Sequence, residues 1–297
     1  GLIAFETAHP VPDESSLAAG AAAIEWLAGL PENSRLLVLV SGGASSLIEH
    51  LRLGVTFEDL VALNKTAHAE GWAIEQINKK RRELSAIKGG ELLRHFAGKA
   101  VRALCISDVE GDGVDVIGSG IGACPKDAAF EYTSEIIASN AVARDSIETL
   151  ARANQFQIIE NTEMLYDDVE VLAPKLAQRV LAGPAGLYIW GGESTVRLPE
   201  DPGYGGRNQA LALLFASEIS GYEGITALFA GTDGTDGPTE NAGGLVDGKS
   251  FSAGESASAA LEAADAGRYL QSVGAALKTG PTGTNVMDIA LVLKSDS

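Results

Sequence analysis

The chain has 297 residues, of which 45% are hydrophobic and 21% charged, and it carries a formal net charge of -18 at pH 7. These values predict a globular protein of one large or two medium domains with a full hydrophobic core. The negative charge argues against nucleic acid or a membrane surface as a general partner. No apolar run approaches the roughly 20 residues that a transmembrane helix needs.

The two cysteines, Cys105 and Cys124, are too few for a disulfide framework or a four-ligand metal site. This usage favours a cytoplasmic location. The chain begins with Gly1 rather than Met, and its first residues resemble the interior of a domain. We therefore expect further sequence upstream of Gly1.

Helical and strand patterns alternate along the chain, which predicts an α/β protein with a largely parallel sheet covered by helices. Helices are expected at residues 15–30, 57–70, 74–84, 126–138, 141–154, 168–182, 209–219, 255–264 and 267–277. Strands are expected at residues 36–40, 100–106, 157–160, 187–190, 225–230, 244–246 and 289–293. The break at Gly183-Pro-Ala-Gly186 predicts two domains, at residues 1–182 and 183–297.

Polar, glycine-rich loops follow several of these strands. In the first loop, Ser41, Gly42, Gly43 and Ser45 lie between a strand and a helix, where backbone N–H groups and hydroxyls suit an anion. A tight turn that requires small residues is the alternative. The next such strand, 100–106, leads directly into two further carboxylates, Asp108 and Asp112.

The basic run Lys79-Lys-Arg-Arg82 lies on an expected helix, and most of it reads as a solvated face. Lys88 differs, because it stands beside two glycines at an expected turn. We interpret Lys88 as a binding residue.

Downstream, Gly231-Thr-Asp-Gly-Thr-Asp-Gly-Pro238 follows the expected strand 225–230. Asp233 and Asp236 therefore stand past the carboxyl end of a strand, where open α/β sheets bind ligands. These residue types are also ordinary in surface turns. Arg207 and Asn208 end another glycine-rich loop, and the recurrence of such loops favours a polar site over isolated turns.

Several familiar motifs can be set aside. Gly243-Gly-Leu-Val-Asp-Gly-Lys-Ser250 has the spacing of a phosphate-binding P-loop, but its interior residues indicate a strand and its Asp-Gly pair a turn. The chain contains no G-x-G-x-x-G fingerprint and no G-x-S-x-G nucleophile motif. The remaining carboxylates, hydroxyls, glycine amides, Lys88 and Arg207 are typical of phosphoryl transfer, in which positioning and charge neutralisation dominate.

Eight ordered motifs resemble the glycerate 2-kinases, a family formerly described as hydroxypyruvate reductases. They are His9-Pro-Val-Pro-Asp-Glu-Ser-Ser16, Ser41-Gly-Gly-Ala-Ser45, Leu84-Ser-Ala-Ile-Lys-Gly-Gly90, Ser107-Asp-Val-Glu-Gly-Asp112, Gly191-Gly-Glu-Ser-Thr-Val196, Gly205-Gly-Arg-Asn-Gln209, Gly231-Thr-Asp-Gly-Thr-Asp-Gly-Pro238 and Thr279-Gly-Pro-Thr-Gly-Thr-Asn-Val286. The last four are similar to the family's C-terminal MOFRL domain. The resemblance implies two α/β domains that face each other across a cleft, the first Rossmann-like. It also implies Mg²⁺-dependent transfer of the ATP γ-phosphate to the 2-hydroxyl of D-glycerate.

The resemblance assigns roles to residues at the matching positions. It implies catalytic roles for Asp108, Arg207 and Asp233, with one aspartate accepting the hydroxyl proton or holding Mg²⁺. Substrate and nucleotide would contact Ser41, Gly42, Gly43, Ser45, Lys88, Glu193, Asn208 and Asn285. Asp112 and Asp236 are the expected metal ligands. Glu193 has the alternative role of bracing its loop.

Three features depart from the family pattern. The family's N-terminal segment with a glycine-lysine motif is absent, and a few dozen residues are missing after Gly120, where Ile121 replaces the usual proline. Met287 stands where the family usually has asparagine. The absent lysine keeps a non-catalytic binding protein as an alternative to the kinase, and an NAD(P)H-dependent hydroxypyruvate reductase is a second alternative. A homodimer is compatible with the sequence, which does not fix the oligomeric state.

Overall fold

The computed structural model describes residues 3–8, 12–69, 74–251 and 255–295. The motif that begins at His9 therefore lies partly outside the described residues. The chain divides into two compact units, Gly1–Ser139 and Asn140–Ser297. No helix in the described part of the chain is long and apolar enough to cross a membrane.

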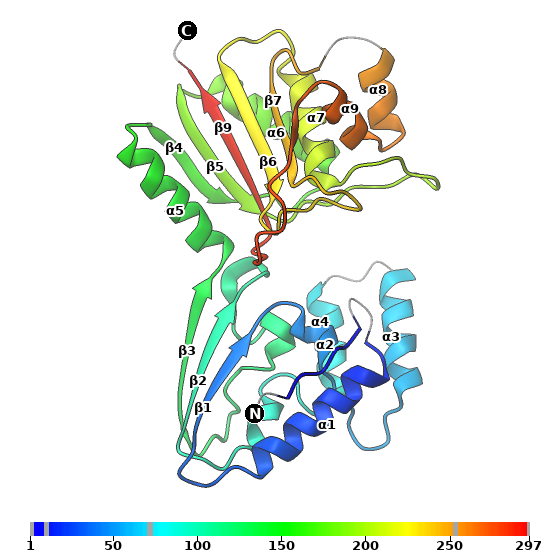
Figure 1. Ribbon diagram of the computed structural model, residues 1–297, viewed down its shortest axis with the longest axis vertical. Coiled ribbons are helices and arrows are strands. Elements are labelled where there is room, and N and C mark those ends of the chain that lie inside the picture. The colour runs from blue at the N-terminus through cyan, green and yellow to red at the C-terminus, as the bar shows by residue number, and fades with distance from the viewer. Residues whose placement is uncertain (1–2, 9–11, 70–73, 252–254, 296–297) are drawn as a thin grey trace. The chain divides into compact units, whose positions relative to one another are not determined.

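The first unit is built on a parallel sheet of β1 (Arg35–Val40), β2 (Ala100–Ile106) and β3 (Glu131–Ala138), in the order β1-β2-β3. The helices α1 (Glu14–Ala28), α2 (Ala44–Leu47), α3 (Phe57–Ala69) and α4 (Ile74–Leu84) lie on one side of it (Figure 1). Side chains alternate along β1, so that Leu36 and Val40 are buried while Leu37 and Leu39 are exposed. The core of this unit therefore lies between the sheet and its helices.

Residues 131–138 form a strand, so the expected helix at 126–138 is wrong. The segment Glu131–Ala138 contains the β-branched residues Thr133, Ile136 and Ile137, which favour an extended backbone. It pairs in parallel with β2, from Ala100 opposite Glu131 onward. Pairing with an existing strand overrides the weak local helical pattern.

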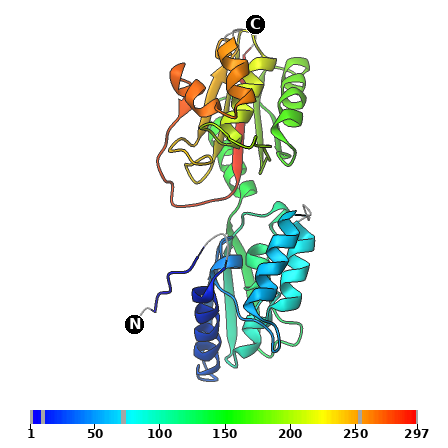
Figure 2. The same cartoon turned by 90° about the vertical axis from the view of Figure 1, so that its right-hand side faces the viewer.

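The second unit contains a six-stranded mixed sheet in the order β4-β5-β9-β6-β7-β8. Its strands are β4 (Ile158–Glu163), β5 (Gly186–Gly192), β6 (Ile225–Gly231), β7 (Gly243–Asp247), β8 (Ala276–Leu277) and β9 (Asp288–Lys294). Its helices are α5 (Asn140–Ala153), α6 (Val169–Ala182), α7 (Arg207–Glu218), α8 (Glu255–Glu262) and α9 (Ala266–Ser272). Helix α5 lies on one side of the sheet and α6 and α7 on the other (Figures 1 and 2).

The expectation of a largely parallel sheet holds in the first unit but not in the second. Only β4 and β5 are parallel among the paired strands of the second sheet, and β9 runs antiparallel to both β5 and β6. The last strand enters the centre of the sheet from a long loop rather than from a crossover helix. The helix expected at 267–277 ends at Ser272, because Gly274 has a φ of 71° and the chain turns into β8.

The segment Asn140–Ala182 belongs to the second unit, whereas the glycine-proline break had suggested a boundary after residue 182. Strand β4 pairs with β5, which ties this segment to the second sheet. Asn140 adds a buried link, because its Nδ2 donates to the carbonyl oxygens of Val286 and Asp288, each at 2.9 Å. The Gly243 segment forms β7, in agreement with the strand expected at residues 244–246.

Replacing Asn140 with Ala should destabilise the second unit. The substitution removes the donor to two buried carbonyl oxygens, and a buried polar group without a partner costs about 1–3 kcal/mol. We expect the free energy of unfolding in urea to fall by about 2–4 kcal/mol. Asn154→Ala, just past the far end of α5 and exposed, is the control and should change it by less than about 1 kcal/mol. Equal effects of both substitutions would contradict the role of Asn140.

Candidate functional site

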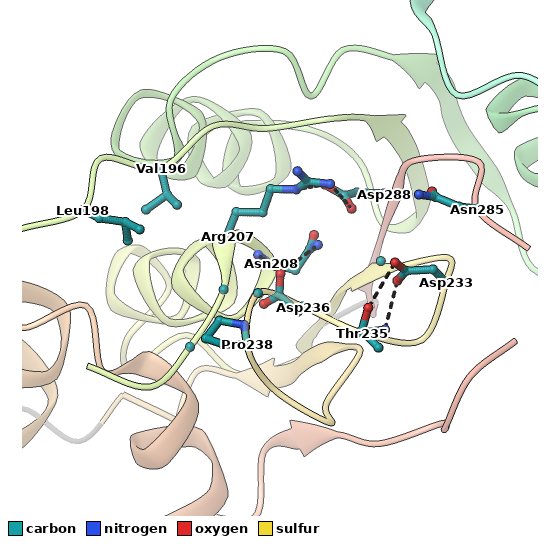
Figure 3. A pocket seen from close by; sticks show the side chains of 14 residues that line it. Val196, Leu198, Arg207, Asn208, Asp233, Thr235, Asp236, Pro238, Asn285 and Asp288 are labelled. Carbon is teal, nitrogen blue, oxygen red and sulfur yellow. Dashed lines mark hydrogen bonds and ion pairs between the residues drawn. The ribbon is translucent and has the colours of Figure 1, made fainter. Parts of the chain in front are cut away.

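A pocket of about 420 Å³ lies at one edge of the second sheet. Strands β5 and β6 end at this edge and β9 begins there, with Asp288 opposite both Gly192 and Gly231 in the sheet register. The pocket is lined by residues of the loops around these strand ends and by the first turn of α7 (Figure 3). The antiparallel entry of β9 is therefore what brings Asp288 to the strand-end loops.

Arg207 is the centre of the charged contacts in this pocket. Its Nε donates to Asp288 Oδ2 at 2.7 Å and its Nη2 to Asp288 Oδ1 at 3.2 Å, in a two-pronged arrangement (Figure 3). Its Nη1 lies 2.8 Å from Glu193 Oε1. The Asp288 side chain is 2% exposed, whereas those of Arg207 and Glu193 are 33% and 47% exposed. The arginine is thus fixed on its buried side and open on the other.

Burial and the ion pair between them both act on the pKa values of Arg207 and Asp288. Burial lowers the pKa of Arg207, but Asp288 and Glu193 outweigh burial and raise it overall. Burial raises the pKa of Asp288, and the contact with Arg207 offsets only part of that rise. Arg207 therefore stays charged at any physiological pH, and Asp288 depends on it for its own ionisation.

Asp236 caps the helix that carries Arg207. Its Oδ1 accepts the backbone N–H of Asn208 at 3.0 Å, and its Oδ2 accepts that of Gln209 at 2.8 Å. The preceding Gly206 has no side chain that could cap α7, so a carboxylate from another loop fills the role. Burial raises the pKa of Asp236 to about 6, although both amide hydrogen bonds lower it. With both oxygens engaged by the helix, Asp236 supports the site rather than offering an open metal ligand.

Asp233 and Asn285 complete the predicted residues of this pocket. Asp233 is half-buried and accepts hydrogen bonds from the Thr235 backbone N–H at 2.9 Å and its hydroxyl at 3.0 Å. Asn285 is exposed, and its Oδ1 accepts the backbone N–H of Met287 at 3.0 Å. Met287 has a φ of 66° in the left-handed region, which asparagine tolerates better than methionine. The departure from the family pattern at Met287 thus falls on a position whose backbone favours asparagine.

The remaining predicted residues lie in the first unit. Asp108 packs directly against Gly42, where an added Cβ would lie 1.5 Å from Asp108 Oδ2. Any side chain at position 42 would therefore collide with Asp108, so the loop that contains Ser41, Gly43 and Ser45 needs glycine there. Asp112 is the last residue of a short 3-10 helix, Glu110–Asp112, that follows β2, and it has a φ of 52°.

Lys88 was expected to contact a ligand, but the structure buries it. It is 1% exposed, and its Nζ contacts Oε2 of Glu49, which is itself 0% exposed. Burial lowers the pKa of Lys88, and Glu49 offsets part of that effect. In this structure Lys88 neutralises a buried carboxylate.

The described residues do not form a ready-made magnesium cage. They contain no group of three or more His, Cys, Asp or Glu side chains arranged to hold a metal ion. The expected ligands Asp112 and Asp236 lie in different units, and Asp236 is committed to α7. Sequence reasoning also missed Asp288, although its place directly after the last glycine-rich motif and at the start of a strand was a usable signal.

Replacing Asp236 with Asn should remove a pH-dependent contribution to stability. Because its folded pKa is raised from 3.8 to about 6, this contribution is fully present below the unfolded pKa and is lost as the pH rises through the folded pKa. We expect the free energy of unfolding of the wild type, relative to that of Asp236→Asn, to fall by up to about 3 kcal/mol from about pH 4 to pH 7. Urea denaturation across this range measures the difference, and a constant difference would contradict the shifted pKa.

Comparisons with known proteins agree with this architecture. Residues 2–153 match the family model described as a domain of unknown function, DUF4147, and residues 186–288 match the MOFRL family. A D-glycerate 2-kinase of Thermotoga maritima is 36% identical over 97% of this chain and 79% of its own. A glycerate 2-kinase of Pyrococcus horikoshii is 31% identical over 97% of this chain and 77% of its own.

A solved structure extends the similarity to the fold. The crystal structure of glycerate kinase from Thermotoga maritima matches with a TM-score of 0.87 and 34% identity, covering 98% of this chain and 80% of that one. The sequence alignment with the Thermotoga relative runs over 335 positions, so that relative has internal residues without a counterpart among the 297 here. The chain belongs to the glycerate 2-kinase family, with a DUF4147 region followed by a MOFRL region.

Proposed function

We propose that this protein is a glycerate 2-kinase, which transfers the γ-phosphoryl group of ATP to the 2-hydroxyl of D-glycerate. The observation that carries the proposal is Arg207, held by Asp288 and Glu193 at the edge where the strand-end loops meet, in a chain of this family. A fixed guanidinium suits the charge that develops on a transferring phosphoryl group. A cytoplasmic location remains part of the proposal and rests on the sparse cysteines.

Asp233 is the proposed acceptor of the hydroxyl proton. In the transfer, the 2-hydroxyl oxygen bonds to the γ-phosphorus, the bond from that phosphorus to the ADP oxygen breaks, and the proton passes to a carboxylate. The Asp233 side chain lines the pocket. Among the described residues, its carboxylate accepts hydrogen bonds from Thr235 alone. Asp236 and Asp288 are less suited, because the helix amides and Arg207 occupy them. Asp108 is the competing acceptor.

Arg207 has one side that a ligand can reach. Its contact with Asp288 is buried, whereas Glu193, on Nη1, is 47% exposed. The Glu193 carboxylate has the charge and the planar oxygens of a ligand oxyanion. We propose that a phosphoryl oxygen replaces Glu193 on Nη1 when substrates bind, while Asp288 keeps the guanidinium oriented.

The charge of the pocket affects the form in which ATP can bind there. Asp233, Asp236 and Asp288 outnumber the single cation Arg207 among the lining residues. A bare triphosphate would meet net repulsion there, so ATP is expected to enter with its own divalent cation. Mg²⁺ that enters with the nucleotide would take its ligands from the phosphates, from water and from one or two carboxylates.

A pair of assays tests the reaction. ATP with D-glycerate should yield ADP and a product that enolase converts, which identifies 2-phosphoglycerate, whereas NADH with hydroxypyruvate should give no oxidation. NADH oxidation would favour a reductase, and inactivity in both assays of the full-length protein would favour a binding protein. Conversion only after phosphoglycerate mutase is added would place the phosphoryl group on the 3-hydroxyl.

Substitutions at the two proposed catalytic residues refine the test. Arg207→Ala and Asp233→Asn should each lower kcat/KM for the kinase reaction by at least about 100-fold. Arg152→Ala, which removes an exposed arginine paired with Glu148 on α5, is the control and should leave it unchanged. Wild-type kcat/KM in either variant would exclude that residue from its role.

A further inference from the structure

A second arginine, Arg81 of α4, has free hydrogen-bonding capacity in the first unit. Its Nε and Nη2 donate to Asn64 Oδ1 at 3.3 and 2.9 Å, and its Nη1 donates to Ser45 Oγ at 3.3 Å. A guanidinium has five N–H groups. Two of them are therefore left without an acceptor among the residues that the structure describes, although the Arg81 side chain is only partly exposed.

A chain of hydroxyls fixes the surroundings of Arg81. Ser45 Oγ and Ser119 Oγ lie 2.7 Å apart, and Ser119 Oγ donates to Asn78 Oδ1 at 3.1 Å. Because the Ser119 proton is used on Asn78, the Ser45 hydroxyl donates to Ser119 and accepts from Arg81. Ser119 has a φ of 59°, a left-handed conformation that is costly for serine and that often marks functional sites. The guanidinium is thus held in one orientation by neutral partners.

The charge of this cluster is unbalanced. Glu49 and Lys88 neutralise each other in a buried ion pair. Within the described ranges, Arg81 has no carboxylate within ion-pair distance, and burial lowers its pKa while Glu49 only partly restores it. Arg207, in contrast, already contacts two carboxylates. The three charged groups Glu49, Lys88 and Arg81 therefore sum to one positive charge, partly withdrawn from water.

We propose that Arg81, positioned by Ser45 and Asn64, binds the carboxylate of the hydroxy-acid substrate. This proposal rests on the proposed kinase function and adds the group that recognises the acid. A carboxylate presents two coplanar oxygens, which match two free N–H groups of a guanidinium. Its single negative charge balances the single positive charge of the cluster. A triphosphate carries several negative charges and needs several cations, so it fits this cluster poorly.

Steady-state kinetics of two variants, each of which loses one positive charge, test whether Arg81 binds the carboxylate. Arg81→Gln should raise KM for D-glycerate by about 10- to 100-fold, the effect of a lost charge-assisted hydrogen bond, and leave KM for ATP within about 2-fold. Lys79→Gln, at an exposed position on the same helix, should change neither constant. A rise in KM for ATP alone, or no change in either constant, would overturn the proposal.

A binding measurement keeps the test independent of turnover. Without nucleotide, D-glycerate should raise the melting temperature of the wild type and of Lys79→Gln, but not that of Arg81→Gln. A shift of equal size in all three proteins would overturn the proposal, as would a shift by inorganic phosphate that exceeds the shift by glycerate. If the wild type binds glycerate through Arg81 but forms no ADP, the kinase function fails while the carboxylate site stands.

Arg81→Lys covers the case in which Arg81→Gln does not fold. Lysine keeps the charge but not the planar pair of N–H groups, so KM for D-glycerate should rise less than in Arg81→Gln yet clearly above the wild type. Wild-type KM for D-glycerate in a folded Arg81→Lys would contradict the two-pronged contact.

Discussion

The ion pair between Arg207 and Asp288 is the constraint on which the pocket depends. Asp288 is nearly fully buried, and a buried carboxylate is costly unless a partner of opposite charge compensates it. The compensation requires β9 to enter the sheet between β5 and β6, and it requires α7 to begin at Arg207. Asp236 secures the second requirement by capping the α7 amides. Fold and site are therefore stabilised by the same contacts.

Much of the site could be predicted from the sequence because its residues follow strands directly. The loop after the strand at residues 225–230 placed Asp233 past a strand end, and the glycine-rich loop before residue 209 singled out Arg207 and Asn208; all three line the pocket. The family motifs added Glu193, which the structure brings into contact with Arg207. Such placement needs only the position of a residue relative to a strand end, which local patterns reveal.

Long-range pairing explains what the sequence did not reveal. Asp288 lines the pocket because β9 runs antiparallel in the centre of the sheet. The strand β3 forms where its β-branched residues meet the pairing edge that β2 offers. Burial of Lys88 depends on Glu49, which lies far from it along the chain. Arg81 stood in a basic run typical of a solvated face, and its inward contacts with Ser45 appear only when α2 and α4 are packed. None of these partners is encoded by local periodicity.

The turnover of Asp288→Asn with ATP and D-glycerate tests most directly whether an anchored Arg207 is needed for phosphoryl transfer. The substitution keeps the shape of the side chain and removes the charge that orients the guanidinium. We predict that kcat falls by at least about 100-fold in a variant that remains folded by circular dichroism. A folded Asp288→Asn protein with wild-type kcat would contradict this central role of the ion pair.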